Sequence, residues 1–125
     1  MTKQERLKSN VESHFEFGNN WAEYSKAIDR EKIREAETSL SKLVSANNLA
    51  GRSFLDIGCG SGIHSLAALN LGVKTLTAVD IDPVSVATTE HTLSKHSKNR
   101  NFRCTVGNVF DQHFCDGQKF DVVYS

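Results

Sequence analysis

The stretch 54–63, Phe-Leu-Asp-Ile-Gly-Cys-Gly-Ser-Gly-Ile, limits what this chain can fold into more than any other part of it. An apolar run typical of a strand buried on both faces leads into glycines at alternate positions, Gly58, Gly60 and Gly62. After Gly62 the apolar residues recur at helical spacing, and Gly72 supplies a left-handed stop. Strand, glycine turn and helix predict the first half of a βαβ unit, in which a ligand approaches bare backbone.

The spacing of the glycines shows which known type of glycine-rich loop this sequence matches. The phosphate loop GxxxxGK[ST] is excluded, because this loop has no Gly-Lys pair. The dinucleotide fingerprint GxGxxG fits at Gly58 and Gly60, but Ile63 stands where the third glycine or alanine belongs. A nicotinamide-binding Rossmann domain therefore stays open as a disfavoured alternative. The pattern that fits is Asp-x-Gly-x-Gly-x-Gly, which begins at Asp56.

Strands and helices alternate through the rest of the chain. Thr75 to Val79 is a predicted strand, Asp82 is a predicted N-cap, and Pro83 suits the first position of the following helix. Further strands are predicted over 102–106 and 120–125, and alternation of this kind predicts an α/β fold with a parallel sheet.

The first 48 residues read as helical. Apolar spacing predicts a helix over residues 3–15, and a longer helix that begins after Asp29 as N-cap and ends at Asn47 and Asn48.

The amino-acid composition limits the kinds of partner and the cellular location that we expect. Lys and Arg number 15 and Asp and Glu number 15, so no net charge attracts nucleic acid or an anionic membrane. No apolar run is long enough for a signal peptide or a membrane span. The three cysteines form no CxxC and the five histidines are scattered, so neither a metal site nor a disulfide framework is expected. We expect a cytoplasmic protein.

The motif at Asp56 continues in three later segments, which begin at Ala78, Val106 and Phe120. Together they resemble the class I S-adenosylmethionine-dependent methyltransferases, from about Leu49 to Ser125. The resemblance implies a Rossmann-like parallel sheet with flanking helices, in which this chain holds the 3-2-1-4 part and is truncated after the fourth strand. We therefore expect residues 1–48 to form an N-terminal helical cap and residues 49–125 to form the first half of an S-adenosylmethionine-binding domain.

The resemblance assigns the polar residues of the cofactor site. Asp56, with the backbone at Gly58 and Gly60, would receive the methionyl ammonium directly or through water; the alternative for Asp56 is a turn-capping acid. Asp80, 18 positions after Gly62, would accept from both ribose hydroxyls. The competing interpretation gives the ribose to Asp82 and makes Asp80 a turn acid; Asp80 is preferred because Asp82 already serves as an N-cap.

Adenine would lie beyond the ribose, against Ile81, whose alternative role is core packing. The amide oxygen of Asn108, where many family members carry Asp, would accept from the adenine amino group. The N–H of Val109 would meet a ring nitrogen.

The predicted cofactor site also takes in the loop residues Cys59 and Gly62, with the Cys59 side chain interpreted as a small packing group. Ser125, at the end of the fourth strand, belongs to the same cleft. Trp21 and Tyr24 would close over the cofactor or, equally, pack as a helix on the sheet.

The expected activity is methyl transfer from S-adenosylmethionine to a small-molecule acceptor, as in the quinone-biosynthesis branch, by analogy alone. We expect the acceptor site and any catalytic base beyond Ser125, so no catalytic residue is named and the chain alone is expected to be incomplete. The exposed edge of the strand at 120–124 is expected to favour self-association. The remaining alternative is a truncated, non-catalytic module that binds cofactor or a partner.

Overall fold

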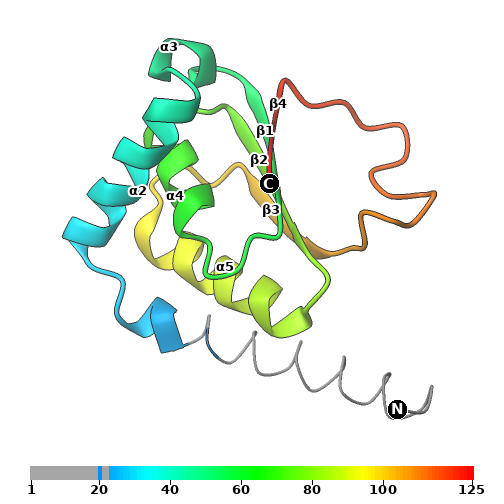
Figure 1. Cartoon of the computed structure of the whole chain (residues 1–125), viewed down its shortest axis with the longest axis horizontal. Coiled ribbons are helices and arrows are strands. Elements are labelled where there is room, and N and C mark those ends of the chain that lie inside the picture. Colours follow the sequence, from blue (N-terminus) through cyan, green and yellow to red (C-terminus); the bar gives the residue numbers. More distant parts are fainter. Residues whose placement is uncertain (1–19, 21–22) are drawn as a thin grey trace.

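The computed structural model describes residue 20 and residues 23–125 (Figure 1). Helices and strands alternate along this part of the chain. The elements are α2 (Arg30–Leu43), α3 (Ala46–Leu49), β1 (Ser53–Ile57), α4 (Ile63–Asn70), β2 (Thr75–Asp80), α5 (Pro83–His96), β3 (Phe102–Val106) and β4 (Val122–Tyr124). The helix predicted over residues 3–15, and Trp21, lie outside the described residues.

Within the described residues the strands form a four-stranded sheet in the order β3-β2-β1-β4. Every pairing is parallel, and Asp56 of β1 lies opposite Ala78 of β2 on one side and Tyr124 of β4 on the other. β1 and β4 therefore flank the point where the strand order reverses, which is where ligands of such sheets bind. The predicted α/β class, parallel sheet and strand order are confirmed.

The helices α2, α4 and α5 lie together on one face of the sheet, and the segment 107–121 runs on the other side (Figure 1). The glycine loop 58–62 leaves the carboxyl end of β1 and enters α4, and the turn at residues 81–82 leaves the carboxyl end of β2 and enters α5. Both connections therefore begin at the same edge of the sheet.

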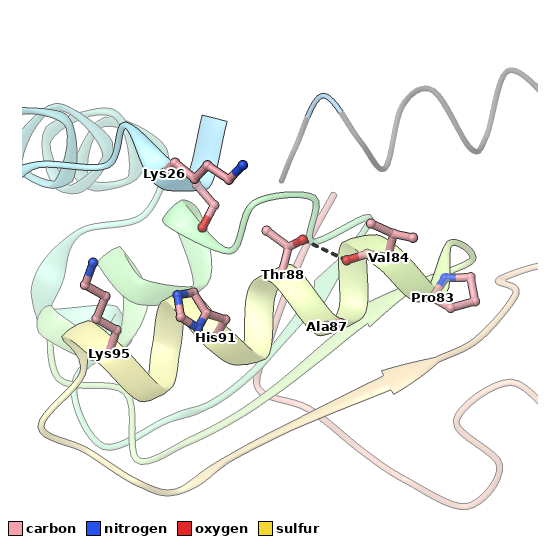
Figure 2. A pocket seen from close by; sticks show the side chains of 8 residues that line it. Lys26, Pro83, Val84, Ala87, Thr88, His91 and Lys95 are labelled. Carbon is pink, nitrogen blue, oxygen red and sulfur yellow. Dashed lines mark hydrogen bonds between the residues drawn. The ribbon is translucent and has the colours of Figure 1, made fainter. Parts of the chain in front are cut away.

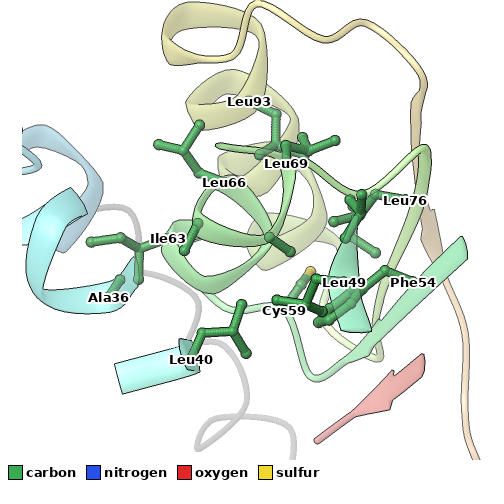
Figure 3. Packing of buried hydrophobic residues seen from close by; sticks show 14 of the residues in the cluster. Ala36, Leu40, Leu49, Phe54, Cys59, Ile63, Leu66, Leu69, Leu76 and Leu93 are labelled. Atoms are coloured by element: carbon green, nitrogen blue, oxygen red, sulfur yellow. The ribbon is translucent and has the colours of Figure 1, made fainter. Parts of the chain in front are cut away.

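The hydrophobic core fills the space between the sheet and the helices (Figure 3). Phe54 and Leu76 of the sheet pack with Leu66 of α4 and Leu93 of α5, and each is 2% exposed or less. Burial of one such side chain contributes about 1.5–3 kcal/mol. Leu40 of α2 belongs to the same cluster, so the segments on either side of the predicted boundary at residue 48 share one core. That boundary stays a prediction.

Helix α2 is shorter than the sequence pattern predicts. Asp29 caps it as expected, because its carboxylate accepts from the Lys32 N–H at 2.9 Å. The helix ends at Leu43, since Val44 takes an extended backbone with φ −135° and ψ 121°. The predicted end at Asn47 and Asn48 is therefore wrong; these residues lie in α3, which brings Leu49 into the core.

Helix α5 begins as predicted but buries hydroxyl groups as well as apolar ones. Asp82 caps it by accepting from the Val84 N–H at 3.1 Å, and Pro83 takes the first helical position. Thr89 and Thr92 are 0% and 1% exposed. The buried face of α5 is therefore partly polar, and its hydroxyls need partners.

Helices α2 and α5 are 14 residues long. In the part of the chain that the structure describes, no helix is long and apolar enough to cross a membrane.

Candidate functional site

The glycine loop has a left-handed backbone at each of its glycines, with φ of +78° at Gly58, +56° at Gly60 and +85° at Gly62. Gly62 is also needed for space, because a Cβ there would lie 2.9 Å from the Cα of Thr89. Gly58 is the opposite case, since a Cβ there would meet no protein atom within 4 Å. The backbone at Gly58 therefore faces open space that a ligand can occupy.

Several N–H groups of the loop are bonded inside the protein. Gly58 and Cys59 both donate to the carbonyl of Val79, at 2.8 and 3.1 Å, and Gly60 donates to the Asp80 carboxylate at 3.1 Å. A phosphate-binding loop instead directs such N–H groups at the anion. This loop is therefore suited to a ligand without phosphate, which counts against the nicotinamide dinucleotide alternative.

Asp80, at the end of β2, connects the two turns that meet at this edge. One carboxylate oxygen accepts from the Gly60 N–H at 3.1 Å and the other from the Asp82 N–H at 3.0 Å. A carboxylate offers about four lone-pair sites, so each oxygen keeps capacity for a ligand hydroxyl. The role as a turn acid and the predicted role at the ribose are therefore compatible in one residue.

Asp82, unlike Asp80, is not accessible to a ligand. It is 8% exposed, and its carboxylate accepts from the Val84 N–H at 3.1 Å and from the Ser85 hydroxyl at 3.2 Å. Asp82 is the N-cap of α5, as expected, and the geometry favours Asp80 over Asp82 for ligand contact.

A cavity of about 340 Å³ lies beside Asp80, at the carboxyl ends of β1 and β2. This volume is in the range of small-molecule sites. The cavity brings together Gly58, Asp80, Ile81, Asn108 and Val109, all of which are predicted site residues. Its full lining is Ile57, Gly58, Val79, Asp80, Ile81, Gly107, Asn108, Val109 and Phe110.

Three apolar residues of the cavity lining are exposed. Ile81 is 49% exposed, Val109 50% and Phe110 93%. The Asn108 amide oxygen accepts from the Phe110 N–H at 2.9 Å, which fixes the turn and leaves one lone pair for a ligand. Phe110 lines the cavity but was not among the predicted site residues. Its aromatic side chain, two positions after Asn108, could have indicated that it lies in the site.

Asp56 lies beneath the loop rather than in the cavity. It is 2% exposed, and the Ser65 hydroxyl of α4 donates to its carboxylate at 2.6 Å. Burial raises the pKa of Asp56 to about 6; the Ser65 hydrogen bond opposes this rise, and the negative charge of Asp80 adds to it. Asp56 therefore anchors the first turn of α4 to β1, and its contact with a methionyl ammonium stays a prediction.

The other predicted site residues lie outside the cavity lining. Cys59 is 6% exposed, and burial raises the pKa of its thiol to about 12, in keeping with a packing role. Gly60 and Gly62 are buried within the loop, whereas Tyr24 and Ser125 are exposed. Cofactor contacts of Tyr24 and Ser125 stay predictions, and Trp21 lies outside the described residues.

A larger cavity, of about 640 Å³, lies between α5 and residues 25–26 (Figure 2). Its lining comprises Ser25, Lys26, Pro83, Val84, Ala87, Thr88, His91 and Lys95. None of these is a predicted site residue, and the glycine loop does not contribute to the lining. We therefore assign the functional site to the smaller cavity beside Asp80.

Two hydroxyl groups of α5 complete the glycine loop and were not predicted. The Thr89 hydroxyl donates to the carbonyl of Gly60 at 3.1 Å, and the Thr92 hydroxyl donates to the carbonyl of Ser61 at 2.8 Å. Thr92 shares a helical face with both Thr88 and Thr89, so the spacing of these threonines does not show which hydroxyls reach the loop.

Comparisons with known proteins identify the family. The family model for ribosomal protein L11 methyltransferase (PrmA) matches residues 35–125. The ribosomal protein L11 methyltransferase of Laribacter hongkongensis is 38% identical over 78 residues, which cover 62% of this chain and 24% of that protein. The one from Staphylococcus saprophyticus is 28% identical over 117 residues, which cover 83% of this chain and 36% of that protein. The chain thus spans 24–36% of the length of these two relatives.

A solved structure supports the fold. Arabidopsis thaliana protein arginine methyltransferase 10 matches with a TM-score of 0.62 and 17% identity, over 86% of this chain and 30% of that one. At this identity the similarity concerns the fold alone.

These findings correct the predicted acceptor. A small-molecule acceptor and the quinone-biosynthesis-like branch are wrong, because the matching family and both relatives are named for methylation of a ribosomal protein. The predicted class of S-adenosylmethionine-dependent methyltransferase, with S-adenosylmethionine as cofactor, is confirmed. Since the family model covers residues 35–125, the chain belongs to the ribosomal protein L11 methyltransferase (PrmA) family.

Proposed function

We propose that this chain forms the S-adenosylmethionine-binding part of a methyltransferase whose acceptor is ribosomal protein L11. The observation that carries the proposal is the cavity in which Gly58, Asp80 and Asn108 meet, in a chain whose family match covers residues 35–125. The acceptor is inferred from the names of the relatives. A cytoplasmic location stays a prediction that goes with this function.

The residues of the cavity suit the cofactor. S-adenosylmethionine carries no phosphate, and the N–H groups of Gly58, Cys59 and Gly60 are already bonded within the protein. Asp80 offers carboxylate lone pairs to the ribose hydroxyls, with the added strength of a charged acceptor. The exposed side chains of Ile81 and Phe110 offer apolar contact to adenine.

The contribution of these residues to methyl transfer is orientation. When bound, the cofactor supplies an activated methyl group on a sulfonium, so the protein has to align the acceptor with it and exclude water. Asp80 would fix the nucleoside end of the cofactor, and the backbone at Gly58 its methionyl end, on the rigid edge of the sheet. We assign no general base to the described residues.

The test has two measurements. Calorimetry should detect binding of S-adenosylhomocysteine by this chain, and the product of the whole gene should transfer a labelled methyl group from S-adenosylmethionine to purified ribosomal protein L11. Small acceptors, including quinone precursors, should stay unlabelled. A folded chain that binds no S-adenosylhomocysteine would refute the cofactor site. Binding without transfer to L11 would instead favour the non-catalytic module.

A further inference from the structure

The peptide groups of the glycine loop are held from two sides. Asp80 accepts from the N–H of Gly60 at 3.1 Å, and the Thr89 hydroxyl donates to the carbonyl of the same residue at 3.1 Å. The next carbonyl, of Ser61, accepts from the Thr92 hydroxyl at 2.8 Å. The two threonines are 0% and 1% exposed, so water does not compete for these bonds.

These hydroxyls fix the direction of the loop's peptide planes. In a trans peptide the carbonyl and the following N–H point in opposite directions. Thr89 draws the Gly60 carbonyl toward α5, so the N–H of Ser61 is directed away from α5. Thr92 does the same for the N–H of Gly62, which reaches the carbonyl of Cys59 at 2.9 Å. Rotation of either peptide would break a buried hydrogen bond.

A neighbouring threonine shows that a hydroxyl on this helix can bond within the helix instead of to the loop. Thr88 is also buried, at 9% exposed, yet its hydroxyl donates to the Val84 carbonyl of its own helix at 2.8 Å (Figure 2). Helical threonines commonly bond in this local way. Thr89 and Thr92 instead reach 29 and 31 residues back to the loop.

Thr92 carries a second bond that fixes its hydroxyl. The Thr92 and Ser25 hydroxyl oxygens lie 3.0 Å apart. Because the one hydrogen of Thr92 is directed at Ser61, Thr92 accepts from Ser25. The donor that holds the Ser61 carbonyl is therefore itself oriented.

We propose that Thr89 and Thr92 are positioning residues of the cofactor site, which hold the Gly60 and Ser61 carbonyls toward α5 and so keep the glycine loop in the conformation that binds cofactor. The inference rests on the proposed function and deepens it. The two residues act through the loop backbone and line no part of the cavity.

The test compares threonine variants of one helix. Thr89→Val and Thr92→Val remove the hydroxyl at nearly constant volume, Thr89→Ser and Thr92→Ser keep it, and Thr88→Val is the matched control that breaks a bond within α5. S-adenosylhomocysteine affinity is measured by calorimetry at a temperature at which thermal melts show each variant folded. Each valine variant at 89 or 92 should bind about two- to tenfold more weakly, as expected for loss of one hydrogen bond. The serine variants should stay within about twofold of the wild type, and Thr88→Val should bind like the wild type.

Amide hydrogen exchange without ligand gives a second measurement. Exchange at residues 60–63 should be faster in Thr89→Val and Thr92→Val than in Thr88→Val at matched melting temperature. If one valine variant does not fold, the comparison rests on the other.

Three outcomes would overturn the inference. Valine variants at 89 and 92 with wild-type affinity and exchange would refute it and leave the proposed function intact. An equal loss in Thr88→Val would assign the effect to the stability of α5. A wild-type chain that binds no S-adenosylhomocysteine would remove the proposed function and this inference together.

Discussion

The Asp80 carboxylate accepts a hydrogen bond from the backbone N–H of Gly60 at 3.1 Å, across 20 residues of sequence. The acid after the second strand and the glycine loop after the first are therefore parts of one structure, although they appear in the sequence as separate motifs. A ligand that bonds to Asp80 acts on a group that already shapes the loop.

Replacement of Asp80 should weaken cofactor binding. In Asp80→Ala the affinity for S-adenosylhomocysteine should fall by about 1–3 kcal/mol, because hydrogen bonds to a charged acceptor are lost. Calorimetry measures the effect, and Asp116→Ala, which removes an acid whose side chain is 76% exposed, is the control. Equal affinities of Asp80→Ala and wild type would exclude Asp80 from the ribose site.

The buried Asp56 should make the fold less stable as the pH rises. Its pKa is raised from 3.8 to about 6, so between these values the folded chain holds a proton that the unfolded chain has released. The contribution of Asp56 to the free energy of unfolding is therefore highest below pH 4 and falls as the pH rises through 6.

Asp56→Asn should remove this dependence. Between pH 4 and pH 7 the free energy of unfolding of the variant should gain on that of the wild type by about 2–3 kcal/mol, from about 1.4 kcal/mol per pKa unit. Urea unfolding at each pH measures it, with Asp116→Asn as control. Parallel pH profiles of wild type and Asp56→Asn would show that Asp56 titrates near its ordinary pKa.

Glycine at position 62 should be needed for space as well as for its backbone angle. Gly62→Ala meets a φ of +85° and a Thr89 Cα 2.9 Å from the new Cβ, whereas Gly117→Ala meets a similar φ of +72° with no atom within 4 Å. The left-handed backbone alone costs about 1–2 kcal/mol, and the close contact adds about 1–3 kcal/mol. Urea unfolding should therefore find Gly62→Ala the more destabilised; equal losses would mean that α5 moves away without cost.

The thiol of Cys59 should resist alkylation in the folded chain. It is 6% exposed and its pKa is raised to about 12, so the reactive thiolate is scarce at pH 8. Peptide mass spectrometry after iodoacetamide treatment should find Cys59 modified in urea and unmodified in buffer. The less buried Cys115 reports that the reagent is active. Rapid modification of Cys59 under native conditions would show that the loop opens.

The sequence predicted the structure correctly at positions where only one structural role suits the residue. Gly62 could be predicted because the left-handed turn before α4 excludes other residues, and Phe54 because a fully apolar run has to be buried. Asp82 could be assigned as a cap because the following residue is Pro83. The end of α2 could not be predicted, since Val44 is no helix breaker and the sequence around it does not mark its extended backbone.

The roles of the threonines and the identity of the acceptor could not be predicted from the sequence, for a different reason. Thr88, Thr89 and Thr92 are the same residue type on one helix, and only the folded chain shows which hydroxyls face their own helix and which face the loop. The acceptor was predicted wrongly because residues such as Asp80 and Asn108 would contact the cofactor, which all branches of the class share. The relatives, rather than the motifs, corrected it.

The bonds that shape the glycine loop have a consequence for the order in which the chain can mature. The glycine signature is compact in the sequence, yet its partners Asp80, Thr89 and Thr92 lie 20, 29 and 31 residues further along. During synthesis the loop leaves the ribosome before any of them, so these three hydrogen bonds cannot form until β2 and α5 have been made. The hydrogen bonds that shape the loop are therefore complete only when the second βα unit packs against the first.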